Sequence, residues 1–252
     1  MDALRGGIYI LPRKFTLDNY NAVLHKDTLL QAAFITVSRT VVATVVQLFL
    51  TAMLAYVLSR REFMFKKSIT LLYVLTMYLN AGMIPIYILI KDLHLINNFW
   101  VYILPGLVSA FNMIVIRTFI YGIPESLSES AQIDGAGHLT IFVRIILPLC
   151  KPVLAVVALF IAVFQWNSWF DTMLYCGFED QLTTLQYELM KLLSSVTSQN
   201  MSAEAMKHTT NLVTPASIRT ATTILTALPI VCLYPFLQRY FITGMTLGGV
   251  KE

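Results

Sequence analysis

Residues 34–58 read FITVSRTVVATVVQLFLTAMLAYVL, and this block contains a single charged residue, Arg39, near one end. About 20 mostly apolar residues are enough to cross the hydrocarbon core of a membrane. Backbone groups inside lipid must form hydrogen bonds within the chain, so we predict that the block is a transmembrane helix. We interpret Arg39 as a side chain that snorkels toward the outer membrane surface.

Four further apolar blocks qualify or nearly qualify as spans, and none contains Asp, Glu, Lys or Arg: residues 69–90, 100–116, 152–170 and 220–238. The composition of the whole chain also indicates a membrane protein, because the 252 residues are 57% hydrophobic and only 13% charged. A soluble domain carries about a quarter charged residues. We therefore predict an all-α membrane protein in which each block is one helix, kinked at Pro85, Pro105 and Pro229.

The charges of the short loops predict the orientation, since Lys and Arg collect on the cytoplasmic side. Residues 60–67 contain four positive charges and one negative charge, whereas residues 91–98 contain one of each. The first loop is therefore expected inside and the second outside. Alternation then puts residues 122–151 inside, 171–215 outside and the tail from residue 242 inside. We interpret Arg117 as a topology anchor at the cytoplasmic end of the third block.

Several classes of function are not supported by the sequence. The net charge of +4 is spread along the chain, without a basic run typical of nucleic-acid binding. The three cysteines and four histidines do not have the spacing of a metal site, so we expect no metal. A phosphate-binding loop is also missing, because Val250 follows the glycines at 244–249 where Lys and Ser or Thr are needed. We therefore expect a chain that is not an enzyme.

The predicted cytoplasmic segment at 124–148 reads PESLSESAQIDGAGHLTIFVRIILP. Pro124 suits the first turn of a helix, and Leu127 and Ala131 recur at helical spacing. Asp134-Gly135 is a turn signal. The segment then predicts a second short helix with Leu139, Phe142 and Ile146 on one face, which Pro148 ends. We expect a helix–turn–helix lying along the membrane surface. An ordinary amphipathic interfacial helix without a partner is the alternative interpretation of this pattern.

The same segment resembles the EAA loop of bacterial ABC-importer permeases. The resemblance is carried by Glu129-Ser130-Ala131, by Gly135 six residues after the glutamate, and by Ile145 and Leu147-Pro148; Ser130 in place of Ala is the departure. It implies a type I ABC importer transmembrane domain, with the loop docked in a cleft of a separate ATPase subunit. The residues implied in this coupling are Glu129, Ala131, Asp134, Gly135, Ala136, Leu139, Phe142, Ile145, Leu147 and Pro148.

Other stretches are similar to carbohydrate-importer permeases, namely residues 80–87, 104–106 and 166–170, and residues 244–251 resemble the tail of the smaller maltose-transporter membrane subunit. The resemblance implies that Met245, Gly248, Gly249 and Lys251 contact the ATPase. It implies that the outer loop at 171–215 reaches an external binding protein. The implied partners are a second permease subunit, an ATPase dimer that holds ATP and Mg, and an extracellular sugar-binding lipoprotein, all at the bacterial cell membrane.

A substrate path is predicted from the polar and aromatic residues at membrane depth. Sugars present hydroxyl groups and an apolar ring face, which amides and aromatic planes can meet. The candidate residues are Asn80, Tyr87, Gln165, Trp166 and Asn167. Interhelical hydrogen bonds and an interfacial aromatic belt are the alternative interpretations.

Three other functions stay open from sequence alone: an ion-gradient transporter, an importer of a solute other than sugar, and a scaffold subunit without a transport path. An ion-gradient transporter is expected to carry ionisable residues inside its spans, and four of the five blocks have none. The resemblance implies six spans with both ends inside. We therefore expect that a first span of the family precedes the five blocks seen here.

Overall fold

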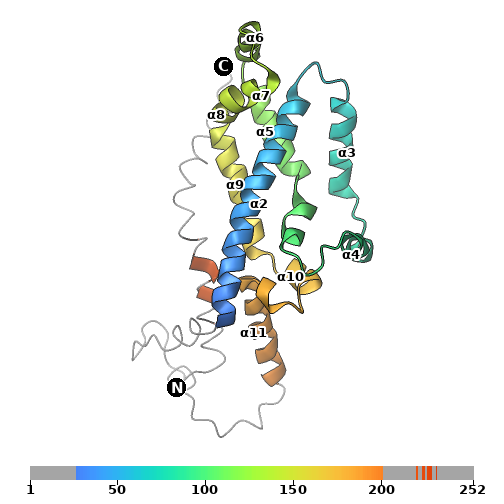
Figure 1. The fold of residues 1–252 in the computed structure, drawn as a ribbon, viewed down its shortest axis with the longest axis vertical. Helices are drawn as coiled ribbons and strands as arrows, with labels where there is room; N and C mark the ends of the chain where they lie inside the picture. Colours follow the sequence, from blue (N-terminus) through green and yellow to red (C-terminus); the bar gives the residue numbers. More distant parts are fainter. Residues whose placement is uncertain (1–26, 201–219, 221–222, 225, 229–230, 232–252) are drawn as a thin grey trace. The chain divides into compact units, whose positions relative to one another are not determined.

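The computed structural model describes residues 27–200 and positions 220, 223, 224, 226–228 and 231 (Figure 1). The chain folds as two compact units. The first unit consists of Met1–Thr36 and Ser168–Pro229, and the second consists of Val37–Asn167 and Ile230–Glu252. The predicted tail at residues 242–252, with all of its predicted ATPase contacts, lies outside the described residues, as do residues 201–215 of the predicted outer loop.

Helix α2 (Asp27–Ser59) is the longest described helix, with 33 residues. It contains neither Gly nor Pro, so nothing in its interior removes a backbone hydrogen bond. At 1.5 Å per residue its length is about 50 Å, more than the hydrocarbon core requires. The helix ends where the hydroxyl of Ser59 donates to the carbonyl of Tyr56 at 2.6 Å. The prediction of a span from this block agrees with the length and hydropathy of the helix.

The second apolar block is not one helix, which corrects the sequence prediction. It forms α3 (Lys66–Tyr78) and α4 (Met83–Asp92), whose axes differ by 118° (Figure 1). The side chain of Asn80 accepts a hydrogen bond from the amide of Gly82 at 2.9 Å, and Gly82 has a φ of +86°. This turn chemistry stops α3. Pro85 then lies in the first turn of α4, where its missing N–H has no intrahelical partner to lose.

The third block is also interrupted. It forms two short 3₁₀ turns, η2 (Phe99–Tyr102) and η3 (Leu104–Gly106), before α5 (Ala110–Tyr121) begins after a 52° bend. The side chains of Asn98 and Ser109 accept hydrogen bonds from the amides of Trp100 and Asn112, which starts each helical piece. Pro105 therefore lies in a 3₁₀ turn and does not kink a continuous helix. The prediction of one helix over 100–116 was wrong because local polar caps override apolar composition.

The rest of the second unit runs through α6 (Ser126–Ile133), α7 (His138–Ile141), the π-helix η4 (Phe142–Ile146), α8 (Leu147–Leu149) and α9 (Lys151–Asn167). The axes before and after Cys150 differ by 83°. In the first unit, α10 (Phe170–Tyr175), the 3₁₀ turn η5 (Asp180–Leu182) and α11 (Leu185–Asn200) follow. Within the described residues, one helix is long and apolar enough to span a membrane, or up to four if each bent pair forms one span.

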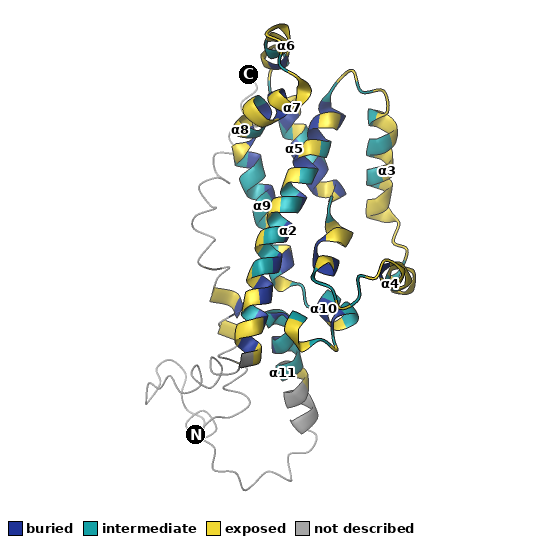
Figure 2. Cartoon of the chain, in the orientation of Figure 1, coloured by how far each residue is buried: buried dark blue, intermediate teal, exposed yellow. Residues whose placement is uncertain are grey.

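The core of the second unit lies between α2, α5 and α9, and Figure 2 shows the buried positions of these helices. Ala52 and Ala55 bring the backbone of α2 close to its neighbours, as small residues do in membrane helix packing. Helix α3 has no buried residue, although α5 packs against it. Many apolar side chains of α3 and α4 are exposed, which is typical of a surface that meets lipid or another subunit.

Candidate functional site

The turn of the predicted coupling segment (residues 124–148) is a well-formed helix stop. The amide of Gly135 donates to the carbonyl of Gln132 at 2.9 Å, and the amide of Ala136 donates to the carbonyl of Ala131 at 2.8 Å. This pair of bonds is the Schellman motif, in which the residue after the C-cap takes a left-handed conformation. Gly135 does so with a φ of +83°. The predicted turn at Asp134-Gly135 is confirmed, and the motif explains why a glycine stands there.

The coupling segment exposes large apolar side chains at and around this turn. Ile133 is 88% exposed, Leu139 is 68% exposed and Leu127 is 44% exposed. Glu129, Asp134 and Pro148 are exposed as well. Ala131 and Ala136, by contrast, are partly buried and pack against the core. The segment therefore presents a surface of mixed apolar and acidic character that the described part of the chain leaves exposed.

The prediction that Phe142 shares an outer face with Leu139 is wrong, because Phe142 is only 2% exposed. Its ring lies 5.3 Å from the ring of Tyr56 and 6.0 Å from the ring of Phe49, both on α2. Ile146 is buried beside it in the same core, and Ile145 and Leu147 pack against that core. Phe142 therefore anchors the coupling segment to α2 and is not available to a partner's cleft.

The anchor has π-helical geometry over Phe142–Ile146. The amide of Leu147 donates to the carbonyl of Phe142, five residues earlier. Pro148 explains this wider turn, because a proline has no N–H and its ring clashes with the carbonyl four residues before it. Single π turns are frequent at functional sites in helices. Here the π turn lies where the coupling segment enters the core.

A buried polar cluster inside the second unit was not predicted. Arg39 is 1% exposed, and its Nε donates to Oε1 of Gln165 at 2.9 Å. The guanidinium carbon of Arg39 lies 4.4 Å from the centre of the Tyr102 ring. Nε2 of Gln165 donates in turn to the carbonyl of Tyr102 at 3.3 Å. The snorkelling interpretation of Arg39 was wrong, since the side chain points into the protein and links α2 to α9.

A periodic signal in the sequence could have indicated this cluster. Polar residues recur at intervals of three and four along α2, with one adjacent pair at 39–40, which puts them on one face of the helix: Thr36, Arg39, Thr40, Thr44, Gln47 and Thr51. Nε2 of Gln47 donates to the carbonyl of Ile103 at 3.4 Å, so this face meets the broken third block. The carbonyl of Ile103 thus gives Gln47 a partner, whereas the buried hydroxyls of Thr40 and Thr44 have no hydrogen-bond partner.

Of the predicted substrate-path residues, only Gln165 belongs to the buried polar cluster. The side chain of Asn80 stabilises the turn before α4, as described above. The side chain of Asn167 is exposed and donates to the carbonyl of Val163 within α9 at 2.8 Å. Tyr87 and Trp166 are partly buried. The structure thus gives the two asparagines local structural roles, and a path through all five residues stays a prediction.

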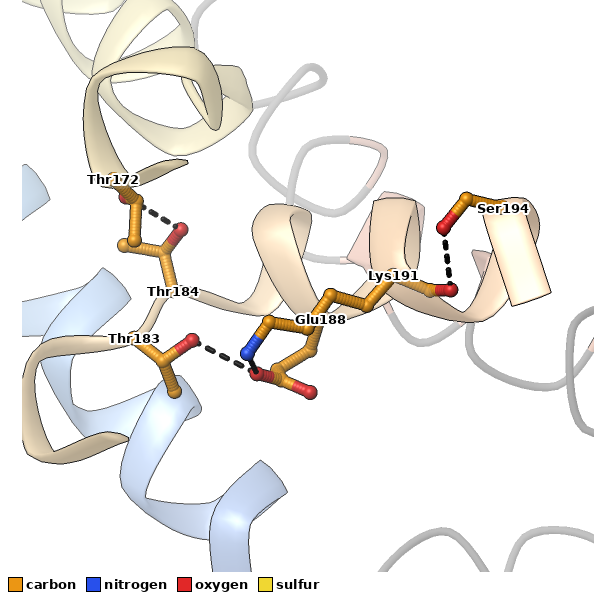
Figure 3. Close-up of polar contacts among 6 residues, drawn as sticks. All are labelled: Thr172, Thr183, Thr184, Glu188, Lys191 and Ser194. Atoms are coloured by element: carbon orange, nitrogen blue, oxygen red, sulfur yellow. Dashed lines mark hydrogen bonds and ion pairs between the residues drawn. The ribbon is translucent and has the colours of Figure 1, made fainter. Parts of the chain in front are cut away.

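Part of the predicted outer loop is helical and is held together by polar contacts within the first unit (Figure 3). The hydroxyls of Thr172 and Thr184 are 3.1 Å apart, and Oε1 of Glu188 accepts from Thr183 and from Nζ of Lys191 at 2.9 and 2.8 Å. The amide of Leu185 donates to the hydroxyl of Thr36 at 2.9 Å. These contacts fix the start of α11 to the amino-terminal part of α2.

The remaining electrostatics of the described residues are modest. In the first unit, burial raises the pKa of Tyr175, and the carboxylate of Asp171 raises it further.

Arg117 donates from Nη1 to the hydroxyl of Thr70 at 2.6 Å and from Nε to the hydroxyl of Tyr121 at 2.9 Å, so it joins α3 to α5. Within the described part of the chain, no cluster of three or more His, Cys, Asp or Glu could hold a metal ion.

Comparison with known proteins covers almost the whole chain. The family described as binding-protein-dependent transport system inner membrane component matches residues 33–246. Protein LplC of Bacillus subtilis (strain 168) is 39% identical over 246 residues, which are 96% of this chain and 81% of that protein. The polygalacturonan/rhamnogalacturonan transport system permease protein YtcP of the same organism is 35% identical over 243 residues, 96% of this chain and 84% of that protein.

A solved structure has the same fold. It is the crystal structure of a bacterial ABC transporter involved in the import of the acidic polysaccharide alginate. One of its chains superimposes on this chain with a TM-score of 0.85 and 29% sequence identity, covering 95% of this chain and 84% of the other. The described helices therefore have the arrangement of a type I ABC importer transmembrane subunit.

Proposed function

As a member of the binding-protein-dependent transport system inner membrane component family, this chain is a permease subunit of an ABC importer, and we propose that the solute it carries is a sugar or oligosaccharide. The family match argues against the ion-gradient transporter considered from sequence. It also argues against an enzyme, since the family members are membrane subunits. The chain lies in the bacterial cell membrane in this proposal.

The proposed substrate class rests on relatives whose names state a sugar, and two of these are described above. One transports polygalacturonan and rhamnogalacturonan and the other imports alginate. Both are polymers that contain uronic acids, so oligosaccharides bearing carboxylates are the first solutes to test. An importer of a different solute stays the alternative, because relatives in one fold can carry different solutes.

We infer that the coupling segment docks on a separate ATPase, and the single observation that carries this is its exposed apolar surface. Ile133 and Leu139 project from the Schellman turn, and an exposed apolar patch beside charged residues is typical of a protein interface. Ala131, Ala136 and Phe142 hold the segment to the core. A rigid element of this kind can carry motion from an ATPase to α2.

The proposed assembly contains a second permease subunit, an ATPase dimer that binds ATP and Mg, and an extracellular sugar-binding lipoprotein. In this assembly Glu129, Asp134, Gly135, Leu139 and Pro148 face the ATPase. Ile145 and Leu147 lie on the core side of the segment and support it. Met245, Gly248, Gly249 and Lys251 are proposed as further ATPase contacts. Asn80, Tyr87, Gln165, Trp166 and Asn167 are proposed to line the path of the solute.

Uptake measurement tests the substrate proposal. A strain that lacks this gene is complemented with the native gene, and accumulation of labelled oligogalacturonides, neutral maltodextrins and a dipeptide is compared. We expect uptake of at least one sugar only in the complemented strain. A vector-only strain gives the background. Uptake of the dipeptide without uptake of any sugar would show that the solute class is wrong, while the family assignment would stand.

A further inference from the structure

A cavity of about 310 Å³ lies within the second unit, where the carboxyl ends of α2 and α5 meet the start of α6. Ser59, Arg60 and Arg61 line it from α2 and the residues that follow. Tyr121 lines it from α5 and Ser128 from α6. On the topology that the loop charges predict, these helix ends lie at the cytoplasmic surface of the membrane.

The segments around the cavity carry an excess of positive charge. Arg60, Arg61, Lys66 and Lys67 follow one another closely, and the acidic residues beside them are Glu62 and Glu125. Oε2 of Glu125, which also lines the cavity, is 3.0 Å from Nε of Arg61, and the side chain of Arg61 remains exposed. Four positive charges therefore stand beside two acidic residues. The surroundings of the cavity therefore favour a ligand with negative charge.

Arg60 is held in place by its neighbours and still has an unused donor. Its guanidinium carbon lies 4.5 Å from the centre of the Tyr56 ring. Nε of Arg60 is buried and has no hydrogen-bond partner. Nζ of Lys66 donates to the carbonyls of Arg60 and Arg61 at 3.5 and 3.1 Å, which fixes the loop. A planar, preorganised guanidinium group is well suited to the oxygens of a phosphate.

Exposed apolar side chains precede and follow the two arginines in the chain. They are Met53 and Val57 on the last turns of α2 and Met64 and Phe65 in the loop after it. Contact with exposed apolar side chains does not stabilise a small water-soluble anion. It does stabilise a phospholipid, because the phosphate of a phospholipid lies directly beside its acyl chains. The exposed apolar residues of the coupling segment, Leu127, Ile133 and Leu139, are not among the residues that line the cavity.

We propose that this cavity binds the headgroup of an anionic phospholipid of the cytoplasmic leaflet. The phosphate contacts Arg60 and Arg61, and the acyl chains lie along Met53 and Val57. Because Ser128 of α6 also lines the cavity, a bound lipid contacts the coupling segment and supports its position. This inference does not depend on which solute is carried.

Binding of short-chain lipids tests the proposal. The full chain is purified in detergent with the subunits that co-purify with it, and the affinities of dihexanoyl phosphatidylglycerol and dihexanoyl phosphatidylcholine are compared. We expect a clear preference for phosphatidylglycerol. Arg60→Gln and Arg61→Gln should each lower the affinity for phosphatidylglycerol about fivefold, because one basic residue near an anionic lipid contributes about 1 kcal/mol. Lys67→Gln, which removes a charge outside the cavity, should weaken it less than twofold.

Four outcomes would overturn the proposal. Equal affinity for both lipids would exclude recognition of the negative charge. Equal effects of Lys67→Gln and Arg61→Gln would indicate diffuse surface charge and no built site. Displacement of the lipid by an equal concentration of inorganic phosphate would indicate a site for free anions. Displacement by added ATPase would indicate that the ATPase occupies the cavity. Arg60 stacks on Tyr56, so Arg60→Gln can also impair folding. If it does, the affinity of Arg61→Gln decides the test.

Discussion

Nε of Arg39 donates a hydrogen bond to Oε1 of Gln165 across 2.9 Å, although 126 residues separate the two in the chain. The bond joins the longest described helix to α9 in a region that excludes water. Tyr102 completes the arrangement, with its ring beside the guanidinium group and its carbonyl bonded to Gln165. A buried polar group of this kind is stabilising only when it is paired, so the cluster specifies how the helices pack.

Breaking the bond between Arg39 and Gln165 is expected to destabilise the protein. Gln165→Leu should cost about 1.5–3 kcal/mol, the usual range for a hydrogen bond to a charged group. The double variant Arg39→Met/Gln165→Leu should lose less than the sum of the single variants, because neither partner is left facing an apolar group. Unfolding in detergent measures these free energies. Arg144→Met, at an exposed arginine, is the control; strictly additive losses would contradict the link.

Gly135 and Gly137 form a matched pair for the turn of the coupling segment. A Cβ atom added at either position meets nothing within 4 Å, but only Gly135 has a positive φ, of +83°. Gly135→Ala should therefore cost about 1–2 kcal/mol through the strained left-handed backbone, and Gly137→Ala should be close to neutral. We expect only Gly135→Ala to lower sugar-stimulated ATPase activity of the assembled importer. Similar activity in both variants would show that the turn geometry is not needed.

Leu139 and Phe142 should respond differently to substitution, since one is exposed and the other is in the core. Phe142→Ala is expected to lower the free energy of unfolding by about 3–5 kcal/mol, as for other buried aromatic residues. Leu139→Ser should leave that free energy nearly unchanged and reduce the amount of ATPase that co-purifies with the chain. Thermal unfolding and a pull-down separate the two effects. If the Leu139→Ser variant co-purifies with as much ATPase as the native chain does, this residue has no docking role.

Thr36 and Thr40 allow a test of how α11 is fixed to α2. The Thr36 hydroxyl accepts from the amide of Leu185, whereas the Thr40 hydroxyl is buried without a hydrogen-bond partner. Thr36→Val should expose the Leu185 amide and increase its hydrogen exchange about tenfold, which corresponds to a loss of about 1.4 kcal/mol. Thr40→Val should be neutral or stabilising, because it removes an unpaired polar group. Equal exchange in both variants would show that the Thr36 bond does not hold α11.

The predictions from sequence were most successful where local physics decides the structure. The apolar block that contains Arg39 is a continuous helix because it has no Gly or Pro in its interior. The turn at Asp134-Gly135 follows from glycine's freedom to take a positive φ at the end of a helix. The resemblance of the coupling segment to a known loop indicated the same family that the comparisons show.

Apolar composition was a poorer guide to where helices end. The blocks at 69–90 and 100–116 each satisfy the length of a span, yet both are broken by side chains that cap their own backbone, Asn80 in the first and Ser109 in the second. Hydropathy averages over such residues. The signal was present in Asn80-Ala81-Gly82, but an Asx turn becomes evident only when the polar side chain is read against its neighbours.

By itself, the sequence determined that this chain is helical and apolar and that a glycine turn lies at Asp134-Gly135, because periodicity and glycine chemistry act over a few residues. Only the tertiary structure decided that Arg39 is buried and that Phe142 is an anchor while Leu139 stays outside. The direction of a side chain depends on which distant helix covers it. For Arg39 that helix is α9, whose Gln165 supplies a hydrogen-bond acceptor for the buried guanidinium group.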